Sequence, residues 1–195
     1  MACVTSLTTG LDGTCEAVKK AGGVNKNIYA GSVKDIDSVT FGTDGDITAI
    51  TFKSAKVLVK FTGRIAKNTA SEPVTAEGEG NVEIYTHTVS PVLYHYTQAE
   101  RKAIEDLFSL DNAFFIVPMR SGQIVVYGIS NDAETIQDFG LKVSEADDAV
   151  GTALNDQNAQ TATFTGEMLH KAILFDESAT YADNITTIEG YLTNP

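Results

Sequence analysis

Apolar and polar residues alternate along several short stretches of the chain. In residues 56–65 (KVLVKFTGRI), Val57, Val59 and Phe61 fall on one face of an extended backbone, and Lys60 falls on the other. A period of two indicates a strand with one buried face. Alternation or an enrichment in β-branched residues predicts further strands at residues 28–33, 36–41, 47–52, 81–96, 113–119, 123–129 and 160–166, with 168–175 as a candidate continuation.

Two short connections predict β-hairpins. The Asp44–Gly45 pair lies between residues 36–41 and 47–52, and Asp-Gly suits a tight turn. Residues 120–122 (RSG) join the two most apolar strands, which contain the runs FFIV and IVVYGI. Runs of this kind are typical of strands buried on both faces, so we place these two strands at the centre of a sheet.

One α-helix is predicted with a defined start. Thr97 and Glu100 have the spacing of a capping box, in which the threonine hydroxyl and the glutamate carboxylate satisfy each other's backbone N–H groups. Ile104 and Leu107 then share one face at helical spacing, and the helix should end near Leu110. Its apolar stripe is narrow, so we expect the helix to lie on a sheet.

Several stretches between these elements are polar. Residues 66–80 are predicted to form an exposed loop or the tip of a long arm, and residues 130–160 a long functional or partner-ordered loop. Residues 176–195 are predicted to form a polar C-terminal tail that docks on a neighbour, and a short helix is a candidate at 14–21. The fold class expected is mainly β (α+β): a single domain over residues 1–195, sandwich-like or barrel-like, with one flanking helix.

Charge is unevenly distributed along the chain. The net charge is −12, and residues 131–195 hold 12 acidic and 2 basic side chains, a net −10. An acidic surface repels nucleic acid, so a protein that grips phosphates is disfavoured. Solubility alone is one explanation for this charge, and a surface past which DNA slides without binding is another.

No sequence feature predicts export or a membrane span, and this bears on the state of the two cysteines. No apolar run approaches the roughly 20 residues that span a bilayer, and the N-terminus lacks a signal-peptide pattern, so we expect no membrane association and a cytoplasmic site of synthesis. Cys3 and Cys15 are therefore expected to be two small, half-buried thiols and not a disulfide.

Residues able to support chemistry are scattered. His87, His95 and His170 make no metal-ligand spacing, and His87 and His95 would lie about 26 Å apart in one extended strand. We expect these histidines to be ordinary surface or interface residues. Neither cysteine lies in a catalytic motif, and no nucleophile elbow or phosphate loop occurs in the sequence.

Clustered carboxylates are the remaining candidates. Asp44–Gly45–Asp46 and Asp147–Asp148 could attract Ca²⁺, but neither has EF-hand spacing, so we expect a turn in the first case and a solvated loop in the second. Glu77 and Glu79 lack an apolar surround that would raise a pKa. We therefore expect no enzyme, no cofactor and no catalytic or metal site.

The elements follow one another in a recognisable order: an N-terminal turn-rich piece leads into a strand, a polar arm precedes a capped helix, and a strong hairpin and an acidic loop precede a last strand. The segments that define this order are Leu11–Asp12 with Cys15, 22–29, 97–107, 113–117, 123–128, 151–156 and 161–166, within residues 10–170. In these segments the chain resembles tail-tube-like structural proteins of tailed bacteriophages that infect Bacteroidota. The last 25 residues have no counterpart in the pattern.

The resemblance implies a β-sandwich whose copies join edge to edge into a ring, of six- or twelve-fold symmetry, around a channel. The protein would be part of the virion, assembled in the host cytoplasm beside other tail, neck or portal proteins, and DNA would only pass through the channel. Two alternatives stay open: a capsid head auxiliary or decoration protein, and a carbohydrate-binding β-sandwich module.

Overall fold

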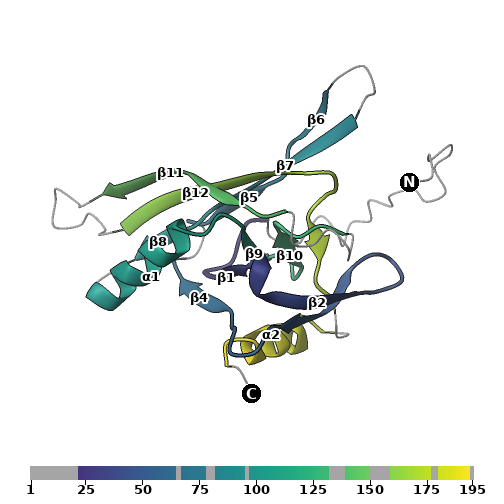
Figure 1. The fold of residues 1–195 in the computed structure, drawn as a ribbon, viewed down its shortest axis with the longest axis horizontal. Coiled ribbons are helices and arrows are strands. Elements are labelled where there is room, and N and C mark those ends of the chain that lie inside the picture. The colour runs from purple at the N-terminus through teal and green to yellow at the C-terminus, as the bar shows by residue number, and fades with distance from the viewer. Residues whose placement is uncertain are drawn as a thin grey trace.

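The computed structural model describes residues 22–64, 67–77, 82–94, 97–131, 139–149, 159–176 and 180–193 (Figure 1). The fold is mainly β, with every pair of named strands antiparallel and a flanking helix, as the sequence predicts. The elements are β1 (Asn27–Ser32), the 3-10 helix η2 (Val33–Asp35), β2 (Ile36–Phe41), β3 (Ile47–Phe52), β4 (Val59–Thr62), β5 (Thr69–Ser71), β6 (Val74–Glu77), β7 (Val82–Ser90), β8 (Val92–Tyr94), α1 (Gln98–Phe108), β9 (Ala113–Pro118), β10 (Ile124–Tyr127), β11 (Lys142–Ala149), β12 (Ala159–Met168), β13 (Ile173–Leu174) and α2 (Tyr181–Gly190).

A five-stranded sheet in the order β13-β10-β9-β1-β4 forms the middle of the molecule. Its central strand, β9, is buried at all six positions, which confirms the central place that the FFIV run predicts. Phe114 and Ile116 contribute to one hydrophobic core, and Phe115 and Val117 contribute to another. Because successive side chains of a strand point to opposite faces, β9 is the wall that the two cores share.

The core that contains Phe115 and Val117 lies between this sheet and a second, six-stranded sheet. The second sheet has the order β11-β12-β7-β5, with β6 paired to β7 and β8 paired to β12. Phe164 of β12 meets Phe115 of β9 with ring centroids 4.8 Å apart. Helix α1 closes one side of this core with Ile104 and Leu107, which are 3% and 4% exposed.

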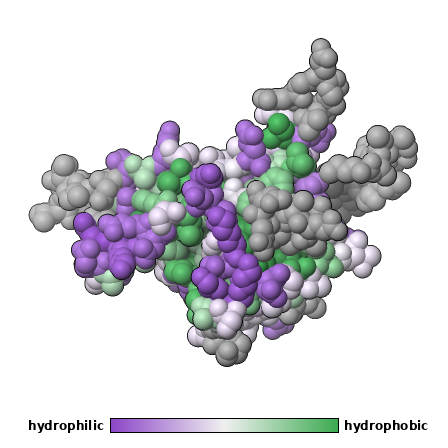
Figure 2. Space-filling model, viewed as in Figure 1, coloured by the Kyte–Doolittle hydropathy of each residue, from purple (hydrophilic) through white to green (hydrophobic). Residues whose placement is uncertain are grey.

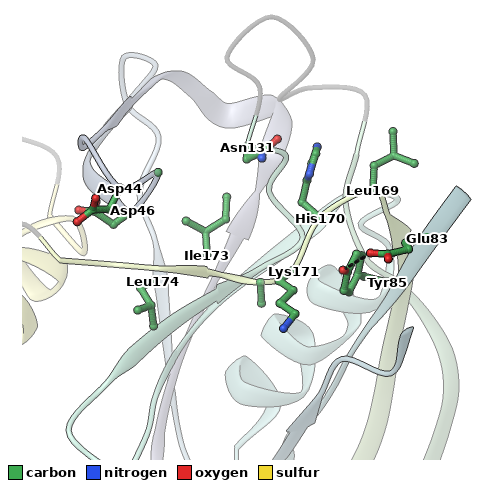
Figure 3. A pocket seen from close by; sticks show the side chains of 12 residues that line it. Asp44, Asp46, Glu83, Tyr85, Asn131, Leu169, His170, Lys171, Ile173 and Leu174 are labelled. Carbon is green, nitrogen blue, oxygen red and sulfur yellow. Dashed lines mark hydrogen bonds between the residues drawn. The ribbon is translucent and has the colours of Figure 1, made fainter. Parts of the chain in front are cut away.

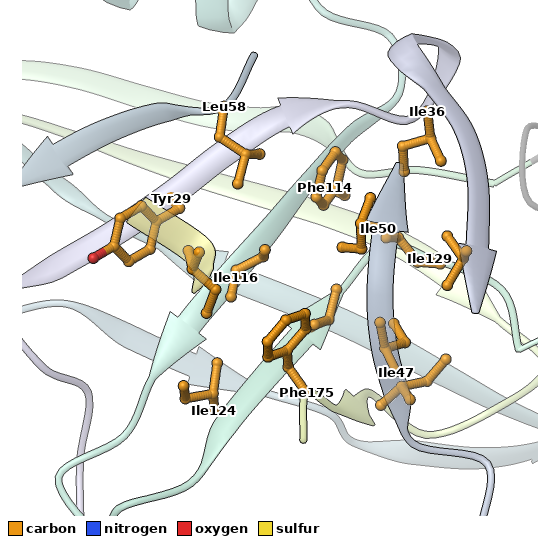
Figure 4. Packing of buried hydrophobic residues seen from close by; sticks show 14 of the residues in the cluster. Tyr29, Ile36, Ile47, Ile50, Leu58, Phe114, Ile116, Ile124, Ile129 and Phe175 are labelled. Carbon is orange, nitrogen blue, oxygen red and sulfur yellow. The ribbon is translucent and has the colours of Figure 1, made fainter. Parts of the chain in front are cut away.

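The core that contains Phe114 and Ile116 lies on the opposite face of the five-stranded sheet. The β2–β3 hairpin and helix α2 cover that face, and their side chains pack around Phe114, Ile116 and Phe175 (Figure 4). Ile188 of α2 is fully buried there. The molecule is therefore layered, with a sheet and α1 on one side of the five-stranded sheet and a hairpin and α2 on the other (Figure 1).

Helix α1 begins with the capping box that the sequence predicts. The Glu100 N–H donates to the Thr97 hydroxyl at 3.3 Å, and the Thr97 N–H donates to the Glu100 carboxylate at 2.8 Å. The helix ends at Phe108, two residues before the predicted end. Its outer face is visible as a hydrophilic patch at the left of Figure 2.

Three predicted polar stretches contain regular structure. Residues 66–80 were expected to be an exposed loop or the tip of a long arm. Strands β5 and β6 form there because both pair with β7, and β6 lies in a ribbon that projects from the body. Strand β11 lies within 130–160 because it pairs along β12. Residues 176–195 contain α2, which packs on this chain's own core, so the prediction of a polar tail was wrong there. Residues 66, 78–80, 132–138, 150–158, 177–179 and 194–195, and the candidate helix at 14–21, lie outside the described residues.

Candidate functional site

His87 of β7 is the most enclosed titratable side chain of those proposed from the sequence. It is 0% exposed, so the expectation of a surface or interface residue was wrong. The Gly128 N–H donates to its Nδ1 at 3.3 Å, and its Nε2 lies 2.9 Å from the backbone oxygen of His170. Nδ1 therefore accepts and Nε2 carries the proton, which defines a neutral tautomer.

The surroundings of His87 favour this neutral form. Burial lowers the pKa of His87 below its usual value, while the His170 carbonyl and the Glu72 carboxylate act in the opposite direction. The Tyr127 ring packs edge-on against His87, with centroids 5.6 Å apart, and burial raises the pKa of Tyr127 to about 12. His87 therefore acts as a structural hydrogen-bonding group, and its ring is closed to solvent.

Gly128 is required beside this histidine. Its φ is +89°, a left-handed conformation that favours glycine. A Cβ at this position would lie 2.8 Å from the backbone oxygen of Ala113. The close approach of β10 to β9 and the hydrogen bond to His87 both depend on the absence of that atom.

A cavity of about 530 Å³ brings some of the sequence candidates together. Asp44 and Asp46 occupy the predicted turn between β2 and β3 at one end, and Glu83 and Tyr85 of β7 stand at the other end (Figure 3). Residues 169–174 run between them, and the Tyr85 hydroxyl donates to Glu83 at 2.8 Å.

These carboxylates do not converge on a metal site. Within the residues that the structure describes, no three histidine, cysteine or acidic side chains are grouped so that they could hold a metal ion. Asp147 lies on β11 and does not line this cavity, and Glu77 is the last residue of β6. Cys3, Cys15, Glu79 and His95 lie outside the described residues.

Two β-ribbons extend from the layered body. One consists of β6 and the first half of β7, and the other of β11 with β12 (Figure 1). Among the residues that the structure describes, each ribbon has a strand that pairs on one side only: β6 pairs with β7, and β11 pairs with β12. Such strands present a row of unpaired backbone donors and acceptors, which are templates for pairing with another chain.

The five-stranded sheet also ends at β4, and within the described part of the chain no strand pairs with the outer side of β4. Val57 and Val59 beside this edge are 36% and 46% exposed. Two cavities of about 230 and 270 Å³ lie between β4 and α1, and both are lined by Val59, Phe61 and Ala103. Figure 2 shows hydrophobic surface in this region beside the hydrophilic face of α1. An apolar groove between β4 and α1 therefore lies beside the end strand of the five-stranded sheet.

One ion-pair network fixes α2 against the same sheet. Glu189 of α2 accepts a hydrogen bond from the Tyr29 hydroxyl at 3.2 Å and pairs with Lys60 of β4. The hydrogen bond and charge of Lys60 lower the pKa of Glu189. Burial raises the pKa of Tyr29, followed by the effect of the Glu189 charge. The tyrosine therefore stays protonated and acts as the donor.

Comparisons with known proteins return no relative. No protein-family model matches the chain, and no curated protein and no solved structure matches it either. In the ranges described, neither helix has the length and apolar character needed to cross a membrane. Functional inference therefore rests on the geometry of the chain itself.

Proposed function

We propose that this protein is a structural subunit of a virion that assembles with copies of itself into a ring or tube of a phage tail or neck. The observation that carries this proposal is the β11–β12 ribbon, which extends from the body and whose strand β11 has no second strand partner among the described residues. The resemblance to tail-tube-like proteins supports the same role.

The physical reason lies in the marginal stability of such ribbons. A two-stranded hairpin is marginally stable in water by itself, and a third strand or a packed surface makes it stable. Natural monomers shorten, charge or cover their open edges to prevent association. Strand β11 is eight residues long, and no strand in the described ranges covers its second side, so a second copy would provide the missing partner. Its acidic side chains disfavour pairing with another β11 and favour pairing with a basic edge.

The acidic C-terminal third suits a channel for DNA. Residues 131–195 carry a net charge of −10, and a channel wall of this sign repels phosphates. In this role DNA passes the protein during ejection without being bound. Neighbouring tail, neck or portal proteins would cap the ring.

Assembly is tested by sedimentation velocity and negative-stain microscopy of the purified chain over a range of concentrations. We expect closed rings or short tubes that persist on dilution. A discrete trimer or a particle-bound monomer would favour a head decoration protein. A monomer at every concentration would contradict self-assembly.

The channel role is tested with fluorescently labelled duplex DNA. We expect no change in DNA anisotropy at any salt concentration, including about 0.01 M, where the Debye length is about 30 Å and attraction would be strongest. Tight binding that weakens with added salt would contradict a channel that repels DNA.

A carbohydrate-binding module is the second candidate, and the cavity beside β7 is the observation that favours it. Asp44, Asp46, Glu83 and Asn131 offer acceptors and an amide, and Tyr85 offers an aromatic ring. Groups of this kind bind hydroxyl-rich ligands. A glycan array with the unsubstituted chain and a Tyr85→Ala variant tests this candidate: binding that the substitution abolishes would support it.

A further inference from the structure

We propose that β4 of one copy pairs with β11 of a second copy in a parallel orientation, and that this contact is the repeated interface of the assembly. This pairing rests on the proposed function, because it names the surfaces through which copies join. β4 and β11 are end strands of two different sheets. A contact between different edges is head-to-tail, so it propagates into rings or filaments and does not stop at a dimer.

The ladder between β1 and β4 defines which backbone groups of β4 face outward. The Gly63 N–H donates to the Lys26 backbone oxygen at 2.7 Å, one position beyond the paired residues Asn27 and Thr62. In an antiparallel ladder, every second residue bonds the partner strand and the residues between face away. Lys60 and Thr62 therefore direct their N–H and C=O groups toward the open edge.

The same reasoning applies to β11. Ala162 of β12 donates its N–H to Pro91 at 3.4 Å, on the side of β12 that faces away from β11. Its partner on β11 is Ala146. The backbone groups of Ala146 therefore face away from β12, toward solvent, whereas those of Glu145 and Asp147 bond to β12.

These alternations select a parallel pairing. In a parallel pair, a residue whose backbone faces the partner lies opposite a residue whose backbone faces away, and both side chains stand on one face. Lys60 then lies beside Glu145 and Asp147, and Phe61 lies beside Ala146. An antiparallel pair would reverse this match and place the two acids beside the apolar side chains of β4.

The space at the open edge suits small side chains. The groove between β4 and α1 comprises the two cavities of about 230 and 270 Å³. One end of the edge is occupied, because the Leu58 N–H donates to the Tyr191 backbone oxygen at 3.0 Å. The open stretch is therefore the four residues of β4, and the methyl group of Ala146 fits above Phe61.

Charge favours the same partner. Residues 53–64, which contain β4, hold four basic side chains and no acidic one. Residues 142–149, which form β11, hold three acidic side chains and one lysine. The rest of the chain is strongly acidic, so the β4 segment is the place where an acidic strand of a second copy meets attraction and not repulsion.

Proline substitutions test the two edges separately. Thr62→Pro removes an outward N–H of β4, and Ala146→Pro removes one from β11, without removing a hydrogen bond of either native ladder. The Thr86 N–H donates to Pro73 at 2.9 Å, which places the N–H of Ala76 on the open side of β6, so Ala76→Pro is the matched control.

We expect Thr62→Pro and Ala146→Pro each to weaken association at least about tenfold in sedimentation velocity, and Ala76→Pro to associate like the unsubstituted chain. An equimolar mixture of the first two variants should form a 1:1 dimer and nothing larger, because only one β4 and one β11 edge remain competent. Circular dichroism verifies that each variant is folded.

Assembly of both variants at unsubstituted strength would overturn the β4–β11 pairing and leave self-assembly intact. Failure of the unsubstituted chain to assemble would instead overturn the proposed function.

Cysteine cross-linking keeps the test decisive if a proline variant unfolds. In a Cys3→Ser, Cys15→Ser background, a Thr62→Cys copy is mixed with an Asp147→Cys copy or with an Ala146→Cys copy under mild oxidation. We expect a disulfide-linked dimer with Asp147→Cys, whose side chain shares a face with that of residue 62 in the parallel alignment. Preferential cross-linking through Ala146→Cys, or no cross-linking with either, would overturn it.

Discussion

At the scale of single residues, His87 connects three segments through one ring. Its Nδ1 accepts from Gly128 after β10, and its Nε2 donates to the His170 carbonyl after β12. Protonation of Nδ1 would remove the acceptor for the Gly128 N–H and place a charge in the core. The neutral ring is therefore part of the folded structure.

This geometry predicts a dependence of stability on pH. The folded-state pKa of His87 lies below 6.5, so the unfolded chain binds its proton first as pH falls. The stabilisation is complete above the unfolded pKa, and it is lost progressively as pH decreases below about 6.5. Urea unfolding between pH 7.5 and 5.5, at concentrations where the chain is monomeric, measures the loss.

A His87→Gln variant tests the assignment. We expect it to lose roughly 1–3 kcal/mol of unfolding free energy at pH 7.5 and to show a weaker decrease at lower pH. His170→Gln is the control, because only the backbone oxygen of His170 contacts His87, and it should keep the full decrease. An unchanged pH dependence in His87→Gln would refute this role.

His87 also shows where sequence reasoning stopped. The period of two in residues 81–96 places His87 on the same face as Val89, which is fully buried. That face assignment was available from the sequence, but the partners Gly128 and His170 are 41 and 83 residues away along the chain. A single sequence does not reveal which distant backbone groups can hydrogen-bond to the nitrogens of a buried histidine ring. The burial of His87 was therefore missed.

At the scale of elements, the two helices differ in how they are encoded. Helix α1 has a capping box and an apolar stripe, and both were predicted correctly. Helix α2 has the sequence YADNITTIEG, which contains one asparagine, two threonines and a glycine, all residues of low helix propensity. Its signal was small: the Thr180 hydroxyl caps the Asp183 N–H, and Ile188 anchors the helix to the core. Tertiary packing therefore stabilises α2.

Helix α1 should respond strongly to loss of its core side chain. Leu107 is 4% exposed in the core between the two sheets. We expect Leu107→Ala to reduce the unfolding free energy by roughly 2–5 kcal/mol. Lys102→Ala on the exposed face is the matched control and should change it by less than about 0.5 kcal/mol. Equal effects in urea unfolding would mean that the helix is not docked.

Helix α2 should respond in the same way to the loss of its own core side chain, Ile188. Ile188 is 0% exposed and lies in the cluster around Phe114 and Ile116. Ile188→Ala should cost roughly 2–5 kcal/mol in thermal or urea unfolding. Thr186→Ala, at an exposed position of the same helix, should be nearly neutral. A neutral result for Ile188→Ala would contradict the packing of α2 on this core and favour the predicted polar tail that docks on a neighbour.

Strands β5, β6 and β11 illustrate a different limit. Their sequences, TAS, VTAE and KVSEADDA, are very short or rich in polar residues, and they are strands because β7 and β12 offer hydrogen-bonding edges. The strongly apolar and alternating strands were predicted because burial determines them. Strands that depend on a partner edge have no such local signal.

At the scale of the whole molecule, assembly should protect the ribbons. In the isolated subunit, we expect limited proteolysis to cleave first within residues 66–80, where a short strand has one partner and Val74 is 55% exposed. In the assembled form, a neighbour should slow that cleavage several-fold relative to a site in an internal control protein. Equal cleavage rates in the two forms would mean that this ribbon stays uncovered.

The central sheet has a consequence for how the chain folds. Its five strands come from residues 27–32, 59–62, 113–118, 124–127 and 173–174, and Tyr29 of β1 pairs with Ile116 of β9. Contacts between residues so far apart raise the contact order, and high contact order slows folding. The sheet remains incomplete until residues 173–174 have been synthesised. In the proposed assembly, the rate of folding would then limit the rate at which association-competent subunits are formed. Slow completion of the sheet would keep the concentration of these subunits low and so prevent premature association.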